Sequence, residues 1–237
     1  MQSRPTDLDR AEAGGYRAAF RAMIISHRHR YVFVHIPKTG GTSLTMALEA
    51  RVGKDDIILS DTPKGRNRRR RVRGVAARGR LWKHSTLADI QGLVDAAALA
   101  DYLVFTLVRN PWARALSYYS WLRGQGFAHP SVRLAKAAGF ADFLRDPMTQ
   151  AQLAVPARHY LTGPQGERAA LCLRLEHLGA DLPQLEARLG FSLHPLPHEN
   201  RSEHGDWRLA YDAETAGIVA RAAAEDIARF GYRFDPD

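Results

Sequence analysis

The chain has 237 residues, of which 45% are hydrophobic and 25% are charged, and its net charge is +9. This composition is typical of a globular protein, and no apolar run approaches the roughly 20 residues that a membrane helix needs. The N-terminus lacks the apolar segment of a secretory signal, and the single cysteine, Cys172, excludes an intramolecular disulfide and a cysteine-based zinc site. We therefore expect a cytoplasmic protein. The positive charge indicates an acidic partner, which is nucleic acid, anionic lipid, a polyanionic glycan or a phosphorylated cofactor.

The chain begins with a polar N-terminal segment, residues 1–29, which contains a short helical piece at 15–25. Residues 30–237 are expected to form a single domain. The β-branched and aromatic run at residues 31–36 predicts a strand that is buried on both faces, and residues 102–108 predict a second strand of the same kind.

The other elements are placed by helix caps, prolines and glycines. Asn110 followed by Pro111 predicts a helix start, because asparagine caps the helix and proline lacks only an N–H that would have no partner there. Asp212 and Gly231 mark the start and end of a long helix at 213–230. The remaining expectations are a helix at 42–51, an exposed mobile loop at 60–80, a helix from Ser85 or Thr86 to about residue 98, short helices within 127–168, a strand at 171–175 and a helix at 181–189.

Strands and helices that alternate along a chain favour a parallel β-sheet flanked by helices on both faces. The predicted fold class is therefore α/β. Ligands of such sheets bind at the carboxyl ends of the strands. Loops 37–43 and 109–111 each follow a predicted strand directly, so we expect them to meet at this edge of the sheet.

The loop Pro-Lys-Thr-Gly-Gly-Thr-Ser, residues 37–43, has the composition of an anion-binding site. Its glycines allow the backbone to approach a ligand closely, its N–H groups can form an anion-binding concavity, and the following helix adds its positive end. The lysine precedes the glycines, whereas in the usual nucleoside triphosphate loop it follows them and a hydroxyl holds Mg²⁺. A glycine-rich turn without any ligand is the alternative interpretation. The candidate ligand-binding residues are Lys38, Thr39, Gly40, Gly41, Thr42 and Ser43.

A second candidate anion site lies at residues 105–119. Arg109 ends a predicted strand and can form a bidentate contact with a phosphate, and Ser117 can donate its hydroxyl from about two turns along the next helix. Arg114 adds a further cation on that helix. The alternative is an ordinary capped helix with Arg109 in a surface ion pair. Two such clusters, each after a buried strand, indicate a ligand with phosphates at two separated points.

The two motifs resemble the two signatures of sulfotransferases that use 3′-phosphoadenosine-5′-phosphosulfate (PAPS). The form of the first motif resembles the carbohydrate branch, which includes heparan sulfate 2-O-sulfotransferase. The resemblance covers residues 31–120 well, 170–235 loosely and 121–169 hardly at all. The residues that carry it are His35-Ile-Pro-Lys-Thr-Gly-Gly-Thr-Ser43 and Phe105-Thr-Leu-Val-Arg-Asn-Pro-Trp-Ala-Arg-Ala-Leu-Ser-Tyr-Tyr119.

The resemblance implies a P-loop fold of the sulfotransferase type and a reaction. A sulfonate group would pass from PAPS to a hydroxyl of a carbohydrate or glycoconjugate acceptor, giving adenosine 3′,5′-bisphosphate (PAP). Lys38 would act on the bridging oxygen between phosphate and sulfonate, while Arg109 and Ser117 would bind the 3′-phosphate. The family needs no Mg²⁺, so no metal is expected.

A base near the acceptor hydroxyl would assist proton loss, and histidine is the usual choice. His84 lies between the two clusters in a Lys-His-Ser sequence, where the carbohydrate sulfotransferases that the chain resembles carry their catalytic histidine. The alternative is that His84 is only part of a loop before a helix. His35 is expected to be packed within the first strand. An Asn-Arg-Ser sequence also matches in type an element that helps to bind PAPS in this branch, although a polar loop would look the same; its residues are Asn200, Arg201 and Ser202.

An arginine-rich run at residues 66–73 lies between the loop and His84. It is expected either to attract a polyanionic acceptor or to be a solvated basic loop. Two other functions stay open, which are a P-loop nucleotide kinase and a nucleic-acid-binding module led by this run. The absence of a Gly-Lys-Ser/Thr step argues against the kinase, and the nucleic-acid module would leave both strand–loop–helix clusters unexplained. Acceptor specificity is expected to depend on residues 121–169.

Overall fold

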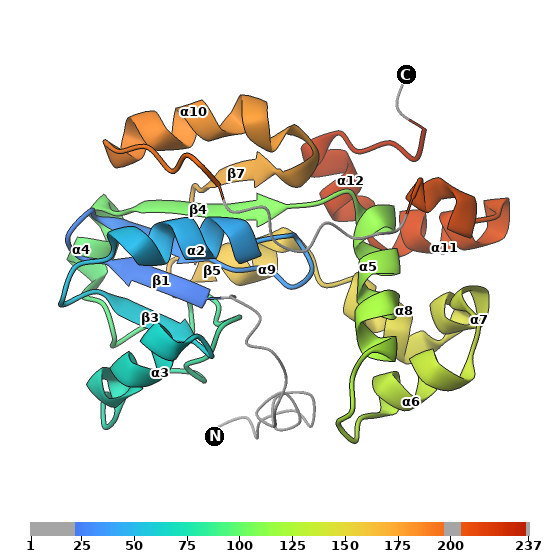
Figure 1. The fold of residues 1–237 in the computed structure, drawn as a ribbon, viewed down its shortest axis with the longest axis horizontal. Coiled ribbons are helices and arrows are strands. Elements are labelled where there is room, and N and C mark those ends of the chain that lie inside the picture. Colours follow the sequence, from blue (N-terminus) through green and yellow to red (C-terminus); the bar gives the residue numbers. More distant parts are fainter. Residues whose placement is uncertain (1–21, 197–204, 236–237) are drawn as a thin grey trace. The chain divides into compact units, whose positions relative to one another are not determined.

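The computed structural model describes residues 22–196 and 205–235 (Figure 1). These residues form two compact units. The first unit comprises residues 22–108 and 158–196, and the second comprises residues 109–157 and 205–235. The expectation of a single domain over residues 30–237 stays a prediction.

A five-stranded sheet forms the centre of the first unit, in the order β3-β1-β2-β4-β7. β2, β4 and β7 run parallel, whereas β1 is antiparallel to both β2 and β3. The predicted α/β class with a parallel core is confirmed, and the antiparallel edge makes the sheet mixed. The strands are β1 (Ala22–Ser26), β2 (Tyr31–Val34), β3 (Ile57–Ser60), β4 (Leu103–Val108) and β7 (Leu171–Arg174), and a separate hairpin consists of β5 (Thr162–Gly163) and β6 (Gly166–Glu167).

β1 corrects the prediction for the N-terminal segment. Its five residues form a fully buried strand, where the end of a helical piece at 15–25 is expected. The chain reverses between the strands, with Arg30 at a φ of 53°, so that Ile24 pairs with Phe33. The apolar residues of β1 suit a helix or a strand equally, and their pairing with two neighbouring strands decides the conformation. The sheet therefore begins before residue 30.

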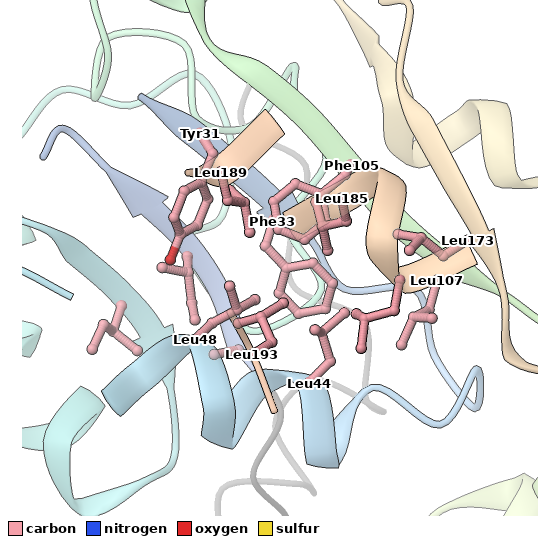
Figure 2. Packing of buried hydrophobic residues seen from close by; sticks show 14 residues of the cluster. Tyr31, Phe33, Leu44, Leu48, Phe105, Leu107, Leu173, Leu185, Leu189 and Leu193 are labelled. Carbon is pink, nitrogen blue, oxygen red and sulfur yellow. The ribbon is translucent and has the colours of Figure 1, made fainter. Parts of the chain in front are cut away.

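The side chains of β2 alternate between two hydrophobic layers, one on each face of the sheet. Tyr31 and Phe33 belong to one layer, and Val32 and Val34 belong to the other. The prediction of a strand buried on both faces is confirmed. Burial of a large apolar side chain contributes about 1.5–3 kcal/mol, so the two layers fix β2 and the start of the loop that follows it. The first layer is completed by side chains of α2 (Thr42–Arg51) and α10 (Leu178–Leu189), which include Leu44, Leu48, Leu185 and Leu189 (Figure 2).

The exposed mobile loop expected at residues 60–80 is wrong for its first half, which is helical. α3 (Pro63–Arg68) is followed by the 3-10 helix η1 (Arg69–Val72). The hydroxyl of Thr62 caps α3 by accepting a hydrogen bond from the backbone N of Gly65 at 2.9 Å, and it donates to the buried Glu49 at 2.9 Å. A Cβ on Gly65 would lie 2.0 Å from Ser60 Oγ, so only glycine lets α3 pack this closely on β3.

The helix expected from Ser85 or Thr86 is also wrong, because residues 85–94 form turns. The backbone N and hydroxyl of Thr86 both donate to Asp89 Oδ2, at 2.7 and 2.8 Å. Such local side-chain bonds compete with helix formation. The helix begins only at α4 (Ala96–Asp101), where Asp95 is the cap. The remaining short elements are α9 (Ala157–Leu161) and the 3-10 helix η2 (Leu175–His177).

The described part of the second unit is helical. The predicted cap at Asn110 is confirmed, and α5 begins at Pro111. The single helix expected at 213–230 is broken at Ala223, and Gly231 ends it with a φ of 66°. The helices are α5 (Pro111–Arg123), α6 (Pro130–Ala137), α7 (Phe140–Arg145), α8 (Pro147–Leu153), η3 (Trp207–Ala210), α11 (Ala213–Ala222) and α12 (Ala224–Phe230).

Candidate functional site

The glycine-rich loop follows β2 and turns through two residues in the left-handed region. Lys38 has a φ of 66° and Gly40 has a φ of 79°. A residue with a Cβ rarely adopts this conformation, which costs about 1–2 kcal/mol, so the surrounding structure must impose it at Lys38. Thr39 is buried and donates its hydroxyl to the backbone oxygen of Ile36 at 2.9 Å, which closes the turn. This hydroxyl therefore shapes the loop, and its predicted role as a ligand donor stays a prediction.

Both glycines of the loop lie where a side chain would not fit. A Cβ on Gly40 would lie 2.7 Å from the side chain of Leu175, and a Cβ on Gly41 would lie 2.6 Å from the ring of His35. The side chains of Leu175 and His35 therefore pack directly against the backbone of the loop. The positive φ angles at Lys38 and Gly40 are the feature of this turn that suits a backbone concavity for an anion such as a phosphate or a sulfate ester.

The helix after the loop adds a positive electrostatic contribution. α2 has ten residues and its N-cap is Gly41, which supplies no capping side chain, and its first turn contains no acidic residue. The positive end of the helix dipole lies at the loop, where it favours a bound anion. Thr42 and Ser43 are the first residues of this helix, and Lys38 adds a full positive charge.

His84 lies against the residue that leads into the loop, within the same unit. Its side chain is buried, with only 5% of the residue exposed. Its Nδ1 lies 2.9 Å from the backbone oxygen of His35 and 3.0 Å from Nδ1 of His35, and the ring centroids are 4.8 Å apart. The structure therefore places His84, the candidate base, at the start of the glycine-rich loop.

The turn that carries His84 is held by further contacts. Trp82 packs edge-on against the His84 ring with centroids 4.9 Å apart, and the guanidinium of Arg80 lies 4.8 Å from the centre of the Trp82 ring. The hydroxyl of Ser85 accepts from the backbone N of Trp82 at 2.9 Å and donates to the backbone oxygen of Arg80 at 2.8 Å. Burial lowers the pKa of Arg80. These contacts restrict the conformations that are open to His84.

His35 is a residue of this site that the sequence prediction assigned to strand packing. It lies just after β2 and is 2% exposed. Its ring contacts Phe33 edge-on, so part of the packing interpretation is correct. The available signal was a polar side chain at the end of an otherwise apolar run, directly before the loop.

The second predicted cluster belongs to the second unit. Arg109 follows the last residue of β4 in the chain, and Ser117 lies half-buried on α5. The side chain of Asn110 accepts hydrogen bonds from the backbone N of Trp112 at 3.1 Å and of Ala113 at 3.4 Å. The joint action of this cluster with the loop stays a prediction. The third predicted element, Asn200, Arg201 and Ser202, lies outside the described residues.

The arginine-rich segment, defined as α3 and η1 with Arg73, is linked to the turn that carries His84 by two ion pairs. Asp61 contacts Arg69 at 3.0 Å and Lys83, the neighbour of His84, at 3.7 Å. Arg68 is tied down by donating to the backbone oxygens of Gly53 and Asp56, at 2.8 and 3.1 Å. The exposed arginines of the segment are Arg66, Arg69, Arg70, Arg71 and Arg73.

A strand, a glycine-rich loop and a helix N-terminus at the end of parallel strands define an α/β protein of the phosphate-binding-loop class. A model of the sulfotransferase family matches residues 21–203, and the chain belongs to this family. It is therefore a sulfotransferase by family. No curated protein sequence matches the chain.

Solved structures that are similar to the chain include two sulfotransferases. One is the crystal structure of mouse sulfotransferase SULT7A1 complexed with PAP, with 16% identity over 86% of this chain and 67% of that chain, at a TM-score of 0.36. The other is a sulfotransferase from Alicyclobacillus acidocaldarius, with 22% identity over 61% of this chain and 60% of that chain, at a TM-score of 0.31.

Two other features are absent from the part of the chain that the structure describes. In residues 22–196 and 205–235, no helix has the length and apolar character to cross a membrane. In the same parts of the chain, no three side chains of His, Cys, Asp or Glu are grouped so as to hold a metal ion.

Proposed function

We propose that the protein transfers a sulfonate group from PAPS to a hydroxyl of a carbohydrate or glycoconjugate, with PAP as the second product. The observation that carries this proposal is the contact between His84 and His35, at 2.9 and 3.0 Å. This contact joins a histidine to the start of a loop that suits an anion, and group transfer requires such alignment of base and donor. Membership of the sulfotransferase family supports the reaction class.

The loop residues fit the 5′-phosphosulfate end of PAPS, because they offer a backbone turn with positive φ angles, a helix N-terminus and a cation. When bound, PAPS supplies the sulfonate, whose bond to the bridging oxygen breaks as the acceptor oxygen bonds to sulfur. Lys38 stabilises the negative charge that develops on the bridging oxygen. His84 accepts the proton that the acceptor hydroxyl loses. Thr42 and Ser43 donate hydroxyl and backbone hydrogen bonds to the same end.

The 3′-phosphate of PAPS is assigned to the second unit in this proposal. Arg109 provides a planar guanidinium that can bind two phosphate oxygens, and Ser117 provides a hydroxyl donor. Asn200, Arg201 and Ser202, which lie outside the described residues, are included in this proposal from their sequence alone as further polar ligands of the cofactor.

An anionic acceptor is supported by the arginine-rich segment. The pairs from Arg69 to Asp61 and from Asp61 to Lys83 connect this segment to the turn of His84. A carbohydrate that carries carboxylate or sulfate groups would be attracted to the exposed arginines while one of its hydroxyls is near His84. Acceptor affinity should then weaken as salt concentration rises from low to physiological values and above.

The test is a transfer assay with PAPS that carries an isotopic label in its sulfonate. The acceptors are a neutral oligosaccharide, a uronate-containing oligosaccharide of the same length, and a simple phenol as a non-carbohydrate. We expect label in the uronate-containing product, and no product with the His84→Ala variant. Label in the phenol alone would contradict the proposal that the acceptor is a carbohydrate. If the protein binds PAP but transfers label to none of the three compounds, the acceptor belongs to none of these three classes.

A further inference from the structure

The hydrogen bonds between His35 and His84 determine which nitrogen of each ring carries a proton. The backbone oxygen of His35 can only accept, and it lies 2.9 Å from Nδ1 of His84, so this nitrogen must be the donor. The same Nδ1 lies 3.0 Å from Nδ1 of His35, which therefore also accepts. The reverse assignment, with His35 as donor, would place two acceptors 2.9 Å apart. Neutral His84 thus has its proton on Nδ1 and its lone pair on Nε2, while His35 has its proton on Nε2.

The geometry points to His35 as a positioning residue that sets the tautomer and the orientation of His84, so that Nε2 of His84 is the basic atom. This inference rests on the proposed function only where it calls His84 a base, because the tautomer is a property of the protein alone. Two acceptors from one residue hold one N–H of His84, the first from the backbone and the second from the side chain. A base whose proton is held on one nitrogen offers its lone pair on the other, which is the arrangement that proton abstraction requires.

The ring of His35 is itself fixed by the loop. A Cβ on Gly41 would lie 2.6 Å from Cδ2 and 2.7 Å from Nε2 of this ring, so Gly41 leaves the space that the ring fills. The ring also contacts Phe33 of β2, with centroids 6.1 Å apart. The backbone of the anion-binding loop, the His35 ring and the His84 ring therefore form one packed series. The position of the loop backbone is coupled in this way to the orientation of the base.

The groups around the His84 ring are compatible with this role. Trp82 contacts the ring edge-on and contributes no titratable group. Arg80 lies over Trp82, and Lys83 beside His84 is paired with Asp61 at 3.7 Å. The assignment of the His84 proton follows from the two acceptors of His35.

The experiment compares two variants of equal shape, His35→Asn and His35→Leu. Asparagine can place its side-chain oxygen near the position of Nδ1 of the imidazole, whereas leucine has the same branching without an acceptor. The full chain is labelled with ¹⁵N in its histidines, and ¹H–¹⁵N correlation spectra without any ligand report which ring nitrogen of His84 is protonated. The His84 signals are identified by their loss in the His84→Ala variant.

We expect the Nδ1–H form of His84 in the unmodified protein and in both variants, because the backbone oxygen of residue 35 remains. The ¹⁵N shifts of His84 should change more in His35→Leu, which lacks the second acceptor and so orients the ring less firmly. The kcat of sulfonate transfer should fall by roughly 10- to 100-fold in His35→Leu and be largely restored in His35→Asn, with the KM for PAPS changed much less. Gly41→Ala keeps His35 but displaces its ring, so it should change the same His84 signals even if His35→Leu folds poorly.

An Nε2–H form of His84 in the unmodified protein would overturn the inference, as would identical spectra and kcat values for His35→Asn and His35→Leu. A failure of the proposed function looks different. In that case the unmodified protein would show the Nδ1–H form of His84 and yet transfer no sulfonate from PAPS.

Discussion

The two predicted anion-binding motifs are built in different ways. The loop at residues 37–43 depends on backbone shape, with positive φ angles at Lys38 and Gly40 and two glycines that have no room for a Cβ. The start of α5 is an ordinary helix start, with an asparagine cap and a proline, and its candidate ligands are the side chains of Arg109 and Ser117. The first unit also contains His84. We therefore propose that the chemical step depends on the first motif and that the second contributes to binding alone.

The strongest contrast is expected between His84→Ala and Ser117→Ala. Loss of the base should lower kcat by about 10²- to 10⁴-fold while PAP affinity stays close to that of the unmodified protein. Ser117→Ala should instead weaken PAP binding and leave kcat at saturating PAPS nearly unchanged. Steady-state kinetics and calorimetric titration with PAP measure both quantities.

The matched control for His84→Ala is His177→Ala, which removes an exposed histidine from the same unit. It should leave kcat unchanged. Unchanged turnover in His84→Ala would refute the assignment of the base.

The next effect is expected for Lys38→Ala. Because the lysine is assigned to the bridging oxygen, where charge develops during transfer, kcat should fall by about 10²- to 10³-fold. PAP affinity should fall less, since the loop backbone and the helix N-terminus remain. If Lys38→Ala loses PAP affinity and keeps its kcat, Lys38 contributes to cofactor binding and not to the chemical step.

A substitution pair tests the difference between backbone and side-chain recognition. Gly40→Ala places a Cβ at a φ of 79° and 2.7 Å from Leu175, so it should lower both PAP affinity, by about tenfold, and the melting temperature. Arg109→Lys should lower PAP affinity and change the melting temperature less, because it keeps the positive charge and loses the planar guanidinium that can bind two phosphate oxygens. Gly139→Ala is the control, since a Cβ there meets nothing within 4 Å. Equal changes in melting temperature for Gly40→Ala and Arg109→Lys would contradict the distinction between backbone and side-chain recognition.

The smallest expected effect concerns Glu49, which lies on α2 behind the loop. Burial raises the pKa of its carboxyl group, although hydrogen bonds from Thr62 and Ser60 and the charge of Lys64 act in the opposite direction. A carboxyl group with a raised pKa in the folded state contributes stability below its unfolded pKa and loses this contribution as the pH rises through the folded value. Glu49→Gln should therefore gain in melting temperature relative to the unmodified protein between about pH 4 and 7, by ~2 °C. A difference that is constant with pH would contradict the raised pKa.

The sequence predicts best where a local pattern and the tertiary structure agree. The strand at residues 31–36, the helix at 42–51 and the cap at Asn110 are found because burial, loop chemistry and capping favour the same conformation. β1 is missed because its conformation is decided by pairing with β2 and β3. The turns at residues 85–94 are missed because Asp89 bonds back to Thr86.

The candidate site follows the same rule. The loop residues and His84 can be predicted from their order and type, but the contact between His35 and His84 joins positions 49 residues apart. No periodicity or spacing encodes which acceptor holds the proton of a buried histidine. The structure supplies this contact and with it the orientation of the His84 ring.

The most direct test of the central claim is calorimetric titration of the full chain with PAP and, separately, with ATP and Mg²⁺. A loop without a Gly-Lys step, combined with a second phosphate site, should bind PAP tightly and ATP not at all. Binding of ATP with Mg²⁺ in preference to PAP would contradict the account and favour a nucleotide kinase.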